Sequence, residues 1–400
     1  MMKEEPLITF NRGSSSLKIG IFNLTAHGAL RLASAAVDFG HAPLSLDITQ
    51  GQHKQHKRSF SLGCDAADEV TLLKEILAIL KLQIDLRRIV RVAHRVVHGG
   101  DEFDSLTLID DEVLAAIERL GVFAPLHQPQ SIALIRALQS VNPFLRQYAS
   151  FDTAFHRTNG DIVQRFALPR VMHDQGIKRY GFHGLSYTSI IKQLQKIAPT
   201  AAQGKVVVAH LGSGASLCGI DNGVSRDTSM GFSTLDGIPM ATRCGALDPG
   251  VILYLLEQKN MSSSELSEIL YHQSGLLGVS GISADTRDLL GEDKPEAKQA
   301  IDLFVLRIAG EIARLAATLG GIDALVFTAG IGEHQPDIRR AIAERCRWLG
   351  AALDDFANNA GTTVVSAPAS RVKIFVIATD EEQVMADQTA VLVNSQINVS

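Results

Sequence analysis

One stretch near the start of the chain recurs in its second half, and this repeat limits the possible folds most. The sequence ITFNRGSSSLKIGI (Ile8–Ile21) resembles VVAHLGSGASLCGI (Val207–Ile220), with Gly13 at the position of Gly212. Each copy has the pattern of a strand, a turn of small residues and a second strand. The spacing exceeds the ~20–50 residues of a solenoid repeat, so the pattern predicts two similar domains. A chance likeness between two Gly/Ser hairpins is the alternative.

Both turns have the composition of a phosphate-binding site. Small residues let ligand oxygens approach backbone N–H groups closely, and Lys18 adds a positive charge to the first hairpin. With one residue of slippage, Ser16 falls on Ser216. No GxxxxGK motif is present and no GxGxxG follows a strand, so neither a P-loop nor a dinucleotide-binding fold is indicated. We expect the two hairpins to face each other across a cleft between domains, a common place for a ligand.

Length, charge and cysteine usage narrow the class of protein. The 400 residues exceed one typical core, which favours two domains. The formal net charge of −5 is scattered without a basic stripe, which argues against a nucleic acid partner. No apolar run approaches the ~20 residues of a membrane helix, and no secretion signal is evident. Dispersed cysteines without a CxxC pair indicate neither zinc nor a disulfide framework and fit a reducing, cytoplasmic setting: Cys64, Cys218, Cys244 and Cys346.

Short runs rich in β-branched residues alternate with longer helical patterns. The apolar spacing over Ile301–Leu319 makes one stripe of a helix, which Gly320 ends. We interpret SADTRDL (residues 283–289) and FTAGIGEH (residues 327–334) as loops. The alternation predicts a layered α/β architecture. The predicted strands are Ile8–Phe10, Ile19–Phe22, Ile89–Ala93, Val206–Ala209, Leu325–Phe327 and Val372–Ile377.

Four polar residues in Gly-rich or strand-end segments are candidates for catalysis. Arg95 in VAHRVVHGG and Arg243 in MATRCGALDPG offer the planar fork that binds carboxylate or phosphate, although a surface salt bridge is the simpler interpretation. Asp152 in YASFDTAFH could bind Mg²⁺ through water, position a nucleophile or cap the next helix. His183 in KRYGFHGLSY could donate to a phosphoryl oxygen or be a satisfied core histidine.

Two further segments suggest contacts with a nucleotide or a metal. Gly330 and Gly332 follow a predicted strand, where backbone N–H groups suit a phosphate or a base. The segment TDEE begins at Thr379. Its acidic residues could stabilise the first turn of a helix that Thr379 caps, or one of them could reach a metal.

The motifs, in their order, resemble those of one known family. The series is NRGSSSLK, HRVVHGG, FDTAFH, RYGFHG, HLGSGAS, DTSMGF, TRCG, SADTRD and FTAGIGE, and TDEE follows near the end. Over essentially its whole length the chain resembles the acetate and propionate kinases of the sugar kinase, Hsp70 and actin superfamily. The resemblance implies an α/β fold of two similar, duplicated ribonuclease H-like (actin-type) domains with an interdomain active-site cleft. The domains would be residues 1–152 with 384–400, and residues 153–383.

The resemblance also implies an activity. Such enzymes transfer the γ-phosphoryl group of ATP reversibly and directly to acetate, which gives acetyl phosphate and ADP. They require Mg²⁺, which Mn²⁺ could replace, and they work as cytoplasmic homodimers. A propionate or butyrate kinase is one alternative, and a non-catalytic actin-type nucleotide-binding module is another.

The resemblance assigns roles to residues of this chain. The catalytic residues would be Arg95, Asp152, His183 and Arg243. Arg95 would also bind the carboxylate substrate, whose alkyl end would lie against Val97, Leu126, Phe182 and Thr234. The metal would be associated with Asn11 and Glu381. The nucleotide would be bound by Ser14, Ser16, Lys18, His210, Leu211, Gly212, Ser213, Gly214, Asp285, Thr286, Arg287, Gly330, Ile331, Gly332, Glu333 and His334.

Several positions depart from the residues usual in this family. None of them carries an assigned catalytic or metal role, so an active kinase is expected. The departures are Arg12 in place of a small residue, Tyr187 in place of His, Ser213 and His334 in place of Asn, Gln128 and Ser131 in APLHQPQS, Thr234 in place of Pro, and Ala241 in place of Gly.

Overall fold

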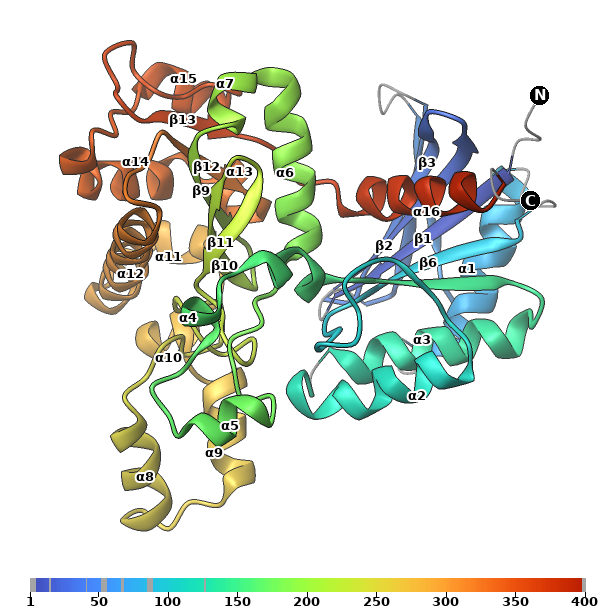
Figure 1. Ribbon diagram of the computed structural model, residues 1–400, viewed down its shortest axis with the longest axis horizontal. Helices are drawn as coiled ribbons and strands as arrows, with labels where there is room; N and C mark the ends of the chain where they lie inside the picture. The colour runs from blue at the N-terminus through green and yellow to red at the C-terminus, as the bar shows by residue number, and fades with distance from the viewer. Residues whose placement is uncertain are drawn as a thin grey trace. The chain divides into compact units, whose positions relative to one another are not determined.

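The chain divides into two compact units, which Figure 1 follows from the N-terminus to the C-terminus. Unit 1 is Met1–Ala154 with Asp380–Ser400, and unit 2 is Phe155–Thr379. The computed structural model describes residues 5–13, 16–40, 42–51, 56–65, 68–84, 89–125 and 127–397. Two predicted site residues, Ser14 and Leu126, lie outside the described residues.

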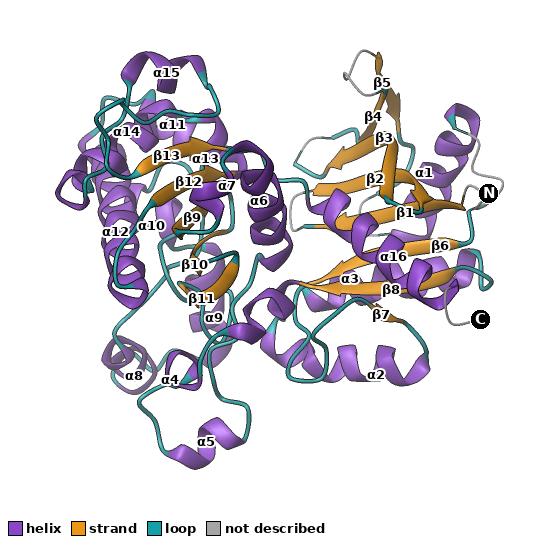
Figure 2. Ribbon diagram, turned by 45° about the horizontal axis from the view of Figure 1, so that its top comes forward, coloured by secondary structure: helices purple, strands orange, loops and turns teal. Residues whose placement is uncertain are grey.

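Unit 1 is built on one mixed sheet (Figure 2). Its elements are β1 (Glu5–Arg12), β2 (Ser16–Thr25), β3 (Gly28–Asp38), β4 (Ser45–Gln50), β5 (His56–Ser61), α1 (Glu69–Gln83), β6 (Arg91–Val96), β7 (Thr107–Leu108), α2 (Asp111–Arg119), the 3₁₀ turn η1 (Leu120–Phe123), α3 (Gln128–Val141), β8 (Arg146–Phe151) and α16 (Glu381–Ile397). The strand order is β5-β4-β3-β2-β1-β6-β8-β7. Strands β1 to β5 form an antiparallel meander, whereas β6 and β8 run parallel to β1.

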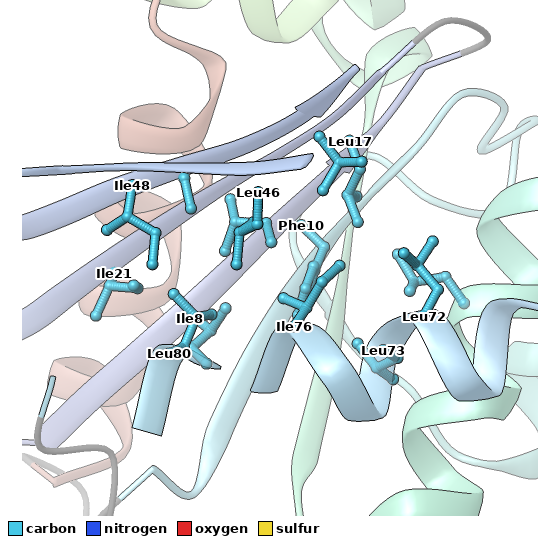
Figure 3. Close-up of a cluster of buried hydrophobic side chains, with 14 of the residues drawn as sticks. Ile8, Phe10, Leu17, Ile21, Leu46, Ile48, Leu72, Leu73, Ile76 and Leu80 are labelled. Carbon is cyan, nitrogen blue, oxygen red and sulfur yellow. The ribbon is translucent and has the colours of Figure 1, made fainter. Parts of the chain in front are cut away.

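The core of unit 1 follows from two periodicities. Alternate residues of a strand share a face, so Ile8 and Phe10 point to the same side of β1. Helix α1 presents Leu72 and Ile76 to that side at helical spacing (Figure 3). Helix α16 packs on β1, β2, β3 and β6, and Asn11 of β1 contacts its first turn. Alternation along β1 thus directs Ile8 and Phe10 into this core and Asn11 to the opposite face, toward α16.

Unit 2 contains a second mixed sheet with strand order β11-β10-β9-β12-β13. Its elements are α4 (Asp161–Gln164), α5 (Arg170–Asp174), α6 (Gly184–Ile197), α7 (Pro199–Ala202), β9 (Lys205–Leu211), β10 (Ala215–Asp221), β11 (Val224–Thr228), α8 (Pro249–Glu257), α9 (Ser263–His272), α10 (Gly275–Ser280), α11 (Thr286–Leu290), α12 (Pro295–Leu319), β12 (Ala324–Thr328), α13 (Ala329–His334), α14 (Pro336–Arg345), the 3₁₀ turn η3 (Arg347–Leu349), α15 (Asp355–Ala360) and β13 (Lys373–Val376). Another 3₁₀ segment, η2 (Asp152–Thr158), contains the division between the units. Helix α12 ends at Gly320 in the left-handed conformation (φ 68°), which confirms the predicted helix and its end. In the part of the chain that the structure describes, no helix combines the length and apolar character needed to cross a bilayer.

The two sheets repeat one topology. In each, a meander of antiparallel strands (β1, β2, β3 or β9, β10, β11) continues into two strands parallel to the first. The turns correspond as well, because Gly13 N–H donates to the Ser16 carbonyl (2.9 Å) and Gly212 N–H donates to the Gly214 carbonyl (3.2 Å). The predicted α/β class and the duplication are therefore confirmed.

The strand register corrects one predicted equivalence. Asn11 pairs with Lys18 across the first hairpin, and His210 pairs with Ser216 across the second. Since Asn11 and His210 hold the same place in the first strand, Lys18 corresponds to Ser216. The predicted match of Ser16 with Ser216 is wrong, because the first turn is the longer one.

Two predicted loops are short helices. The segment SADTRDL contains α11, which begins where the Asp285 carboxylate accepts from Arg287 N–H (2.8 Å). The segment TAGIGEH contains α13, which begins at Ala329; Ala329 N–H donates to the Glu333 carboxylate (2.9 Å). Side chains satisfy the first N–H groups of each helix.

The predicted cap of the last helix is also wrong. Gln383 N–H donates to the Asp380 carboxylate (3.0 Å), so Asp380 and not Thr379 caps α16, which begins at Glu381. A carboxylate at this place also favours the positive end of the helix dipole.

Candidate functional site

In unit 1, Arg95 lies at the centre of a buried polar cluster. It is near the end of β6, which pairs with β8. Asp152 directly follows the last residue of β8. Arg95 donates to the fully buried Asp152 carboxylate from Nε (3.0 Å) and Nη2 (2.6 Å), and its Nη1 donates to Asn11 Oδ1 (3.3 Å). Burial alone would lower the pKa of Arg95. The negative charges of Asp152 and Glu381 together have the larger effect, and they raise this pKa above its usual range. The predicted residues Asn11, Arg95 and Asp152 thus form one charged network.

The first turn of α16 completes this cluster. Asn11 Nδ2 donates to the carboxylates of Glu381 and Glu382, both at 2.8 Å. Burial raises the pKa of Glu382. The positive charge of the nearby Lys18 lowers this pKa, and the negative charge of Glu381 raises it further. The acidic residues of TDEE left open which of them could reach a metal, and the family resemblance assigned only Glu381 to it; the structure places Glu382 beside Asn11 as well.

These two carboxylates suit Mg²⁺. This ion commonly takes one or two protein carboxylates and completes its octahedron with waters and phosphate oxygens. Asn11 holds Glu381 and Glu382 together through one amide group. Among the described residues, no group of three or more His, Cys, Asp or Glu could hold a metal by itself. The donor set therefore fits an ion that a bound nucleotide would help to hold.

Polar residues of α3 fix the backbone around Arg95. Ser131 Oγ donates to the Arg95 carbonyl (3.2 Å). Gln128 is fully buried and brackets His98, accepting from its N–H (3.2 Å) and donating to its carbonyl (3.0 Å). Val97 lies between these anchored residues and is itself buried. Two departures from the family pattern, Gln128 and Ser131, thus have a structural role beside the predicted substrate residues Arg95 and Val97.

In unit 2, a pair of histidines lies beside the second hairpin. His210 is on β9, and His183 precedes α6 in the left-handed conformation (φ 59°). Their rings stack with centroids 4.3 Å apart. His183 Nδ1 is hydrogen-bonded to Ser216 Oγ and His210 Nδ1 to Ser186 Oγ, both at 2.8 Å. Each ring is therefore held at Nδ1 by a serine.

Arg243 joins His183 at the hairpin turn. A methyl group placed on Gly214 would lie 3.5 Å from both His183 Nε2 and Arg243 Nη2. Arg243 Nη1 donates to the carbonyl of the buried Thr234 (3.0 Å). Phe182, the residue before His183, is buried as well. The structure therefore brings the predicted residues His183, Arg243 and Gly214 together, with Thr234 attached to Arg243.

The remaining nucleotide candidates lie on α11, on α13 and in the hairpin turns. Asp285 is paired with Arg287 (3.0 Å from Nε) at the exposed start of α11, and Thr286 is buried. Gly330 is exposed with open space around it, whereas the Glu333 carboxylate binds backbone N–H groups of Ala329 and Thr379. The other members are Ser16, Lys18 and Ser213 in or beside the hairpin turns, Gly212 and buried Leu211 of the second hairpin, and Ile331, Gly332 and exposed His334 of α13.

Arg339 is a buried cation that sequence reasoning missed. Its guanidinium donates to the carbonyls of Gly332 (3.0 Å) and Glu333 (2.9 Å), at the end of α13. It also donates to Asn358 Oδ1 (2.7 Å) and to the Asn358 carbonyl (2.7 Å). Arg339 thus anchors the segment that carries predicted nucleotide residues. Nothing in its local sequence marks it as different from its neighbour Arg340.

Known proteins resemble this chain over nearly its whole length. The model of the acetokinase family matches residues 6–387. The acetate kinase of Methylocella silvestris is 44% identical over 395 residues, which cover 97% of this chain and 98% of the relative. The acetate kinase of Rhodopseudomonas palustris (strain TIE-1) is 45% identical over 95% of this chain and 96% of its own.

Solved structures agree with this match. A propionate kinase from Francisella tularensis has a TM-score of 0.86 at 34% identity, covering 96% of this chain and 98% of its own. The acetate kinase of Porphyromonas gingivalis has a TM-score of 0.83 at 33% identity, covering 97% and 100%. The family model, the relatives and the fold all agree, and the chain belongs to the acetokinase family.

Proposed function

We propose that this protein transfers the γ-phosphoryl group of ATP reversibly to acetate and so forms acetyl phosphate and ADP. As a member of the acetokinase family it is a phosphotransferase with a carboxyl group as acceptor. The observation that carries the choice of acetate is the near-full-length match, at 44% identity, to a protein named acetate kinase.

The acceptor needs no general base. An acetate oxygen is already an anion, so the obstacle is repulsion between it and the phosphoryl group. Positioning and electrostatic stabilisation are the main tasks of a phosphoryl-transfer site. Arg243 and the His183 Nε2 side of the ring, both beside Gly214, could supply such stabilisation in unit 2. Lys18 and Arg95 carry positive charge in unit 1.

Asp152 fits the role of an orienting group. Its fully buried carboxylate accepts from two nitrogens of the partly buried Arg95. A carboxylate engaged in this way holds the guanidinium in one orientation and is a poor base. We assign to Asp152 the positioning of Arg95, and to Arg95 the binding of the acceptor carboxylate.

We assign the metal to Glu381 and Glu382, with Asn11 holding the two carboxylates together. When bound, Mg²⁺ would neutralise phosphate charge on the nucleotide. Glu333, by contrast, is engaged with backbone N–H groups, so we assign it the support of α13 and not direct contact with ATP.

A hydroxamate assay with ATP, Mg²⁺ and acetate tests the proposal directly. Formation of acyl hydroxamate is expected, and its absence while ATP still binds would favour a non-catalytic nucleotide-binding module. Propionate is the second candidate acceptor, because a propionate kinase has the fold of this chain with a TM-score of 0.86. Comparing kcat/KM for acetate, propionate and butyrate decides between them, and one methylene is worth about 10–200-fold in such a pocket.

We also propose that the protein forms a homodimer through unit 2. Helix α8 has no buried residue, yet it is apolar and exposes Leu253 and Tyr254. Val171 of α5 is exposed too, and both ribbon views place α5 and α8 at the same end of unit 2 (Figures 1 and 2). Exposed apolar patches mark interaction surfaces. Light scattering should show a dimer that Leu253→Glu dissociates and that Val391→Glu, at an exposed position of α16, leaves intact.

A further inference from the structure

His183 adopts a backbone conformation that non-glycine residues rarely occupy. Its φ of 59° and ψ of 25° place it in the left-handed region, directly before α6. Such conformations persist where the surrounding structure enforces them, and they occur often at functional sites. Here the His183 carbonyl accepts from Tyr187 N–H (3.1 Å) in the first turn of α6. The ring is therefore placed by the start of this helix.

A buried chain of hydroxyl groups ends on the His183 ring. Tyr187 OH lies 2.5 Å from Ser216 Oγ, and Ser216 Oγ lies 2.8 Å from His183 Nδ1. Tyr187 and Ser216 are both fully buried, on α6 and β10. The Tyr187 ring also packs edge-on against His156 (5.6 Å between centroids), which fixes where its hydroxyl points.

The acidities of the three groups determine which one donates in each hydrogen bond of this series. A phenol is a stronger acid than a serine hydroxyl, so Tyr187 is the better donor and Ser216 the better acceptor between them. The proton of Ser216 is then available to His183 Nδ1. A neutral imidazole that accepts at Nδ1 must carry its proton on Nε2.

The other ring nitrogen is on the side of the proposed reaction. His183 Nε2 and Arg243 Nη2 would each lie 3.5 Å from a methyl group on Gly214, in the turn of the second hairpin. A proton on Nε2 makes His183 a hydrogen-bond donor toward this turn. The opposite tautomer would present a lone pair there, which repels phosphoryl oxygens.

We propose that Tyr187 is a positioning residue that acts through Ser216 to keep the proton of neutral His183 on Nε2. The inference rests on the proposed function, because it supplies the donor that phosphoryl transfer to acetate would use. When His183 is protonated, both ring nitrogens carry hydrogen and Ser216 turns to accept from Nδ1. Nε2 is therefore a donor in both charge states.

The charged and titratable surroundings of His183 come from several elements. His210 of β9 stacks on the ring, and Arg243 of the loop before α8 lies beside the same glycine. Tyr187 is on the helix that His183 precedes, and His156 of η2 donates from Nε2 to the Phe182 carbonyl. A second positive charge next to Arg243 is unfavourable. The tautomer of the neutral ring therefore matters for the reaction.

Ring-nitrogen NMR of the full protein tests the tautomer without any assay of activity. With ¹⁵N-labelled histidine, the His183 signals are identified by their loss in His183→Gln. At about pH 8.5, above the usual imidazole pKa, the unmodified protein should show a protonated Nε2. Tyr187→Phe removes only the hydroxyl group, and Nδ1–H should then gain population because Ser216 is free to accept from it. The proposal is overturned by identical His183 tautomers in the two proteins.

Kinetics test the consequence of the tautomer. Tyr187→Phe should lower kcat at about pH 8.5 by roughly 10²–10⁴-fold, the range between losing one donor and losing the correct tautomer of a catalytic histidine. The KM values for ATP and acetate should change little. The loss should shrink as pH falls, because a protonated His183 regains its Nε2–H. A pH-independent loss would contradict the proposal.

Tyr180→Phe is the matched control. It removes a phenol hydroxyl of unit 2 that donates to the Gly176 carbonyl (2.9 Å). We expect no change in the His183 signals or in the pH profile of kcat. If the protein formed no acyl phosphate from acetate, the proposed function would fail, and the NMR comparison would still decide the tautomer.

Discussion

Arg12 shows how one unusual residue can be explained by distant partners. Its guanidinium pairs with Glu69 (3.2 Å), the first residue of α1, and lies 3.9 Å from the centre of the Phe39 ring. Burial raises the pKa of Glu69, and the charge of Arg12 opposes that rise. Arg12 therefore links the end of β1 to the first residue of α1 through an ion pair. The sequence could not indicate this, because both partners are far away along the chain.

Arg95→Ala should weaken unit 1 as well as the reaction. The substitution leaves the Asp152 carboxylate buried without its strongest partner, which costs about 3–5 kcal/mol of unfolding free energy. The double variant Arg95→Ala with Asp152→Ala should be less destabilised than the sum of the single variants. Urea unfolding of the three proteins measures this, and additive effects would argue against the ion pair.

Gly214→Ala should impair activity without harming stability. The added methyl group meets His183 Nε2 and Arg243 Nη2 at an ordinary contact distance of 3.5 Å, so the protein can accommodate it. It would nevertheless occupy the space in front of both groups, and displacement of a reacting group can cost about 10²-fold in rate. We expect a lower kcat with an unchanged melting temperature.

Gly310→Ala is the control for that substitution. Gly310 lies within α12, and a methyl group there meets nothing within 4 Å. Alanine should raise the unfolding free energy by roughly 0.5–1 kcal/mol through helix propensity. Normal activity in Gly310→Ala with reduced activity in Gly214→Ala is the expected pair of results. Equal activity in both would remove Gly214 from the site.

At the scale of elements, long periodic segments were predictable and short helices were not. The stripe of Ile301–Leu319 identified α12 because many residues repeat its spacing. Helices α11 and α13 are too short to show a period, and they depend on side-chain contacts. For α13 these come from Glu333 at one end and Arg339 at the other. Contacts of this kind leave no local pattern.

Arg339→Met tests the support of α13. The change leaves the carbonyls of Gly332, Glu333 and Asn358 without a buried donor, at a cost of about 1–3 kcal/mol of unfolding free energy. The KM for ATP should rise several-fold while the KM for acetate stays nearly constant. Arg340→Ala breaks only surface pairs and should cost at most about 1 kcal/mol. Equal effects of the two substitutions on the KM for ATP would contradict this role.

At the scale of the molecule, the repeat predicted the duplicated topology, whereas the register and partners came only from the structure. Gly13 and Gly212 lie in equivalent turns both in the aligned sequence repeat and in the structure. The correspondence of Lys18 with Ser216 needed cross-strand pairing, because the loops differ in length. The candidate site residues were predicted from their motifs. Their supporting residues, such as Ser216, depend on tertiary contacts that no short motif contains.

Buried histidines should make both units sensitive to acid. Burial lowers the pKa values of His94 and His98 in unit 1, and of His156 in unit 2, to about 4. Between pH 6.5 and 4 the unfolded chain binds protons that the native protein excludes, so the unfolding free energy falls as pH falls. Each histidine contributes up to about 3 kcal/mol, present above pH 6.5 and lost on approaching pH 4.

Urea unfolding at about pH 7.5 and pH 5 measures this dependence, since the unfolded imidazole titrates between them. His94→Gln should show a smaller loss of stability on acidification than the unmodified protein. His272→Gln changes an exposed histidine and should behave like the unmodified protein. An unchanged pH dependence in His94→Gln would show that His94 is not protected from protons in the native state.

The division of unit 1 between the two ends of the chain has a consequence for biosynthesis. Unit 2 is one continuous segment, Phe155–Thr379, whereas unit 1 needs Asp380–Ser400. At roughly 5–20 residues per second, a ribosome spends about 10–45 s between Ala154 and Asp380. Throughout that time the β1–β2–β3 surface lacks α16, and Asn11 lacks both glutamates. The residues assigned to the metal come together only after Asp380–Ser400 has been synthesised, so a chain terminated before Asp380 could fold unit 2 and still lack both glutamates of the proposed metal site.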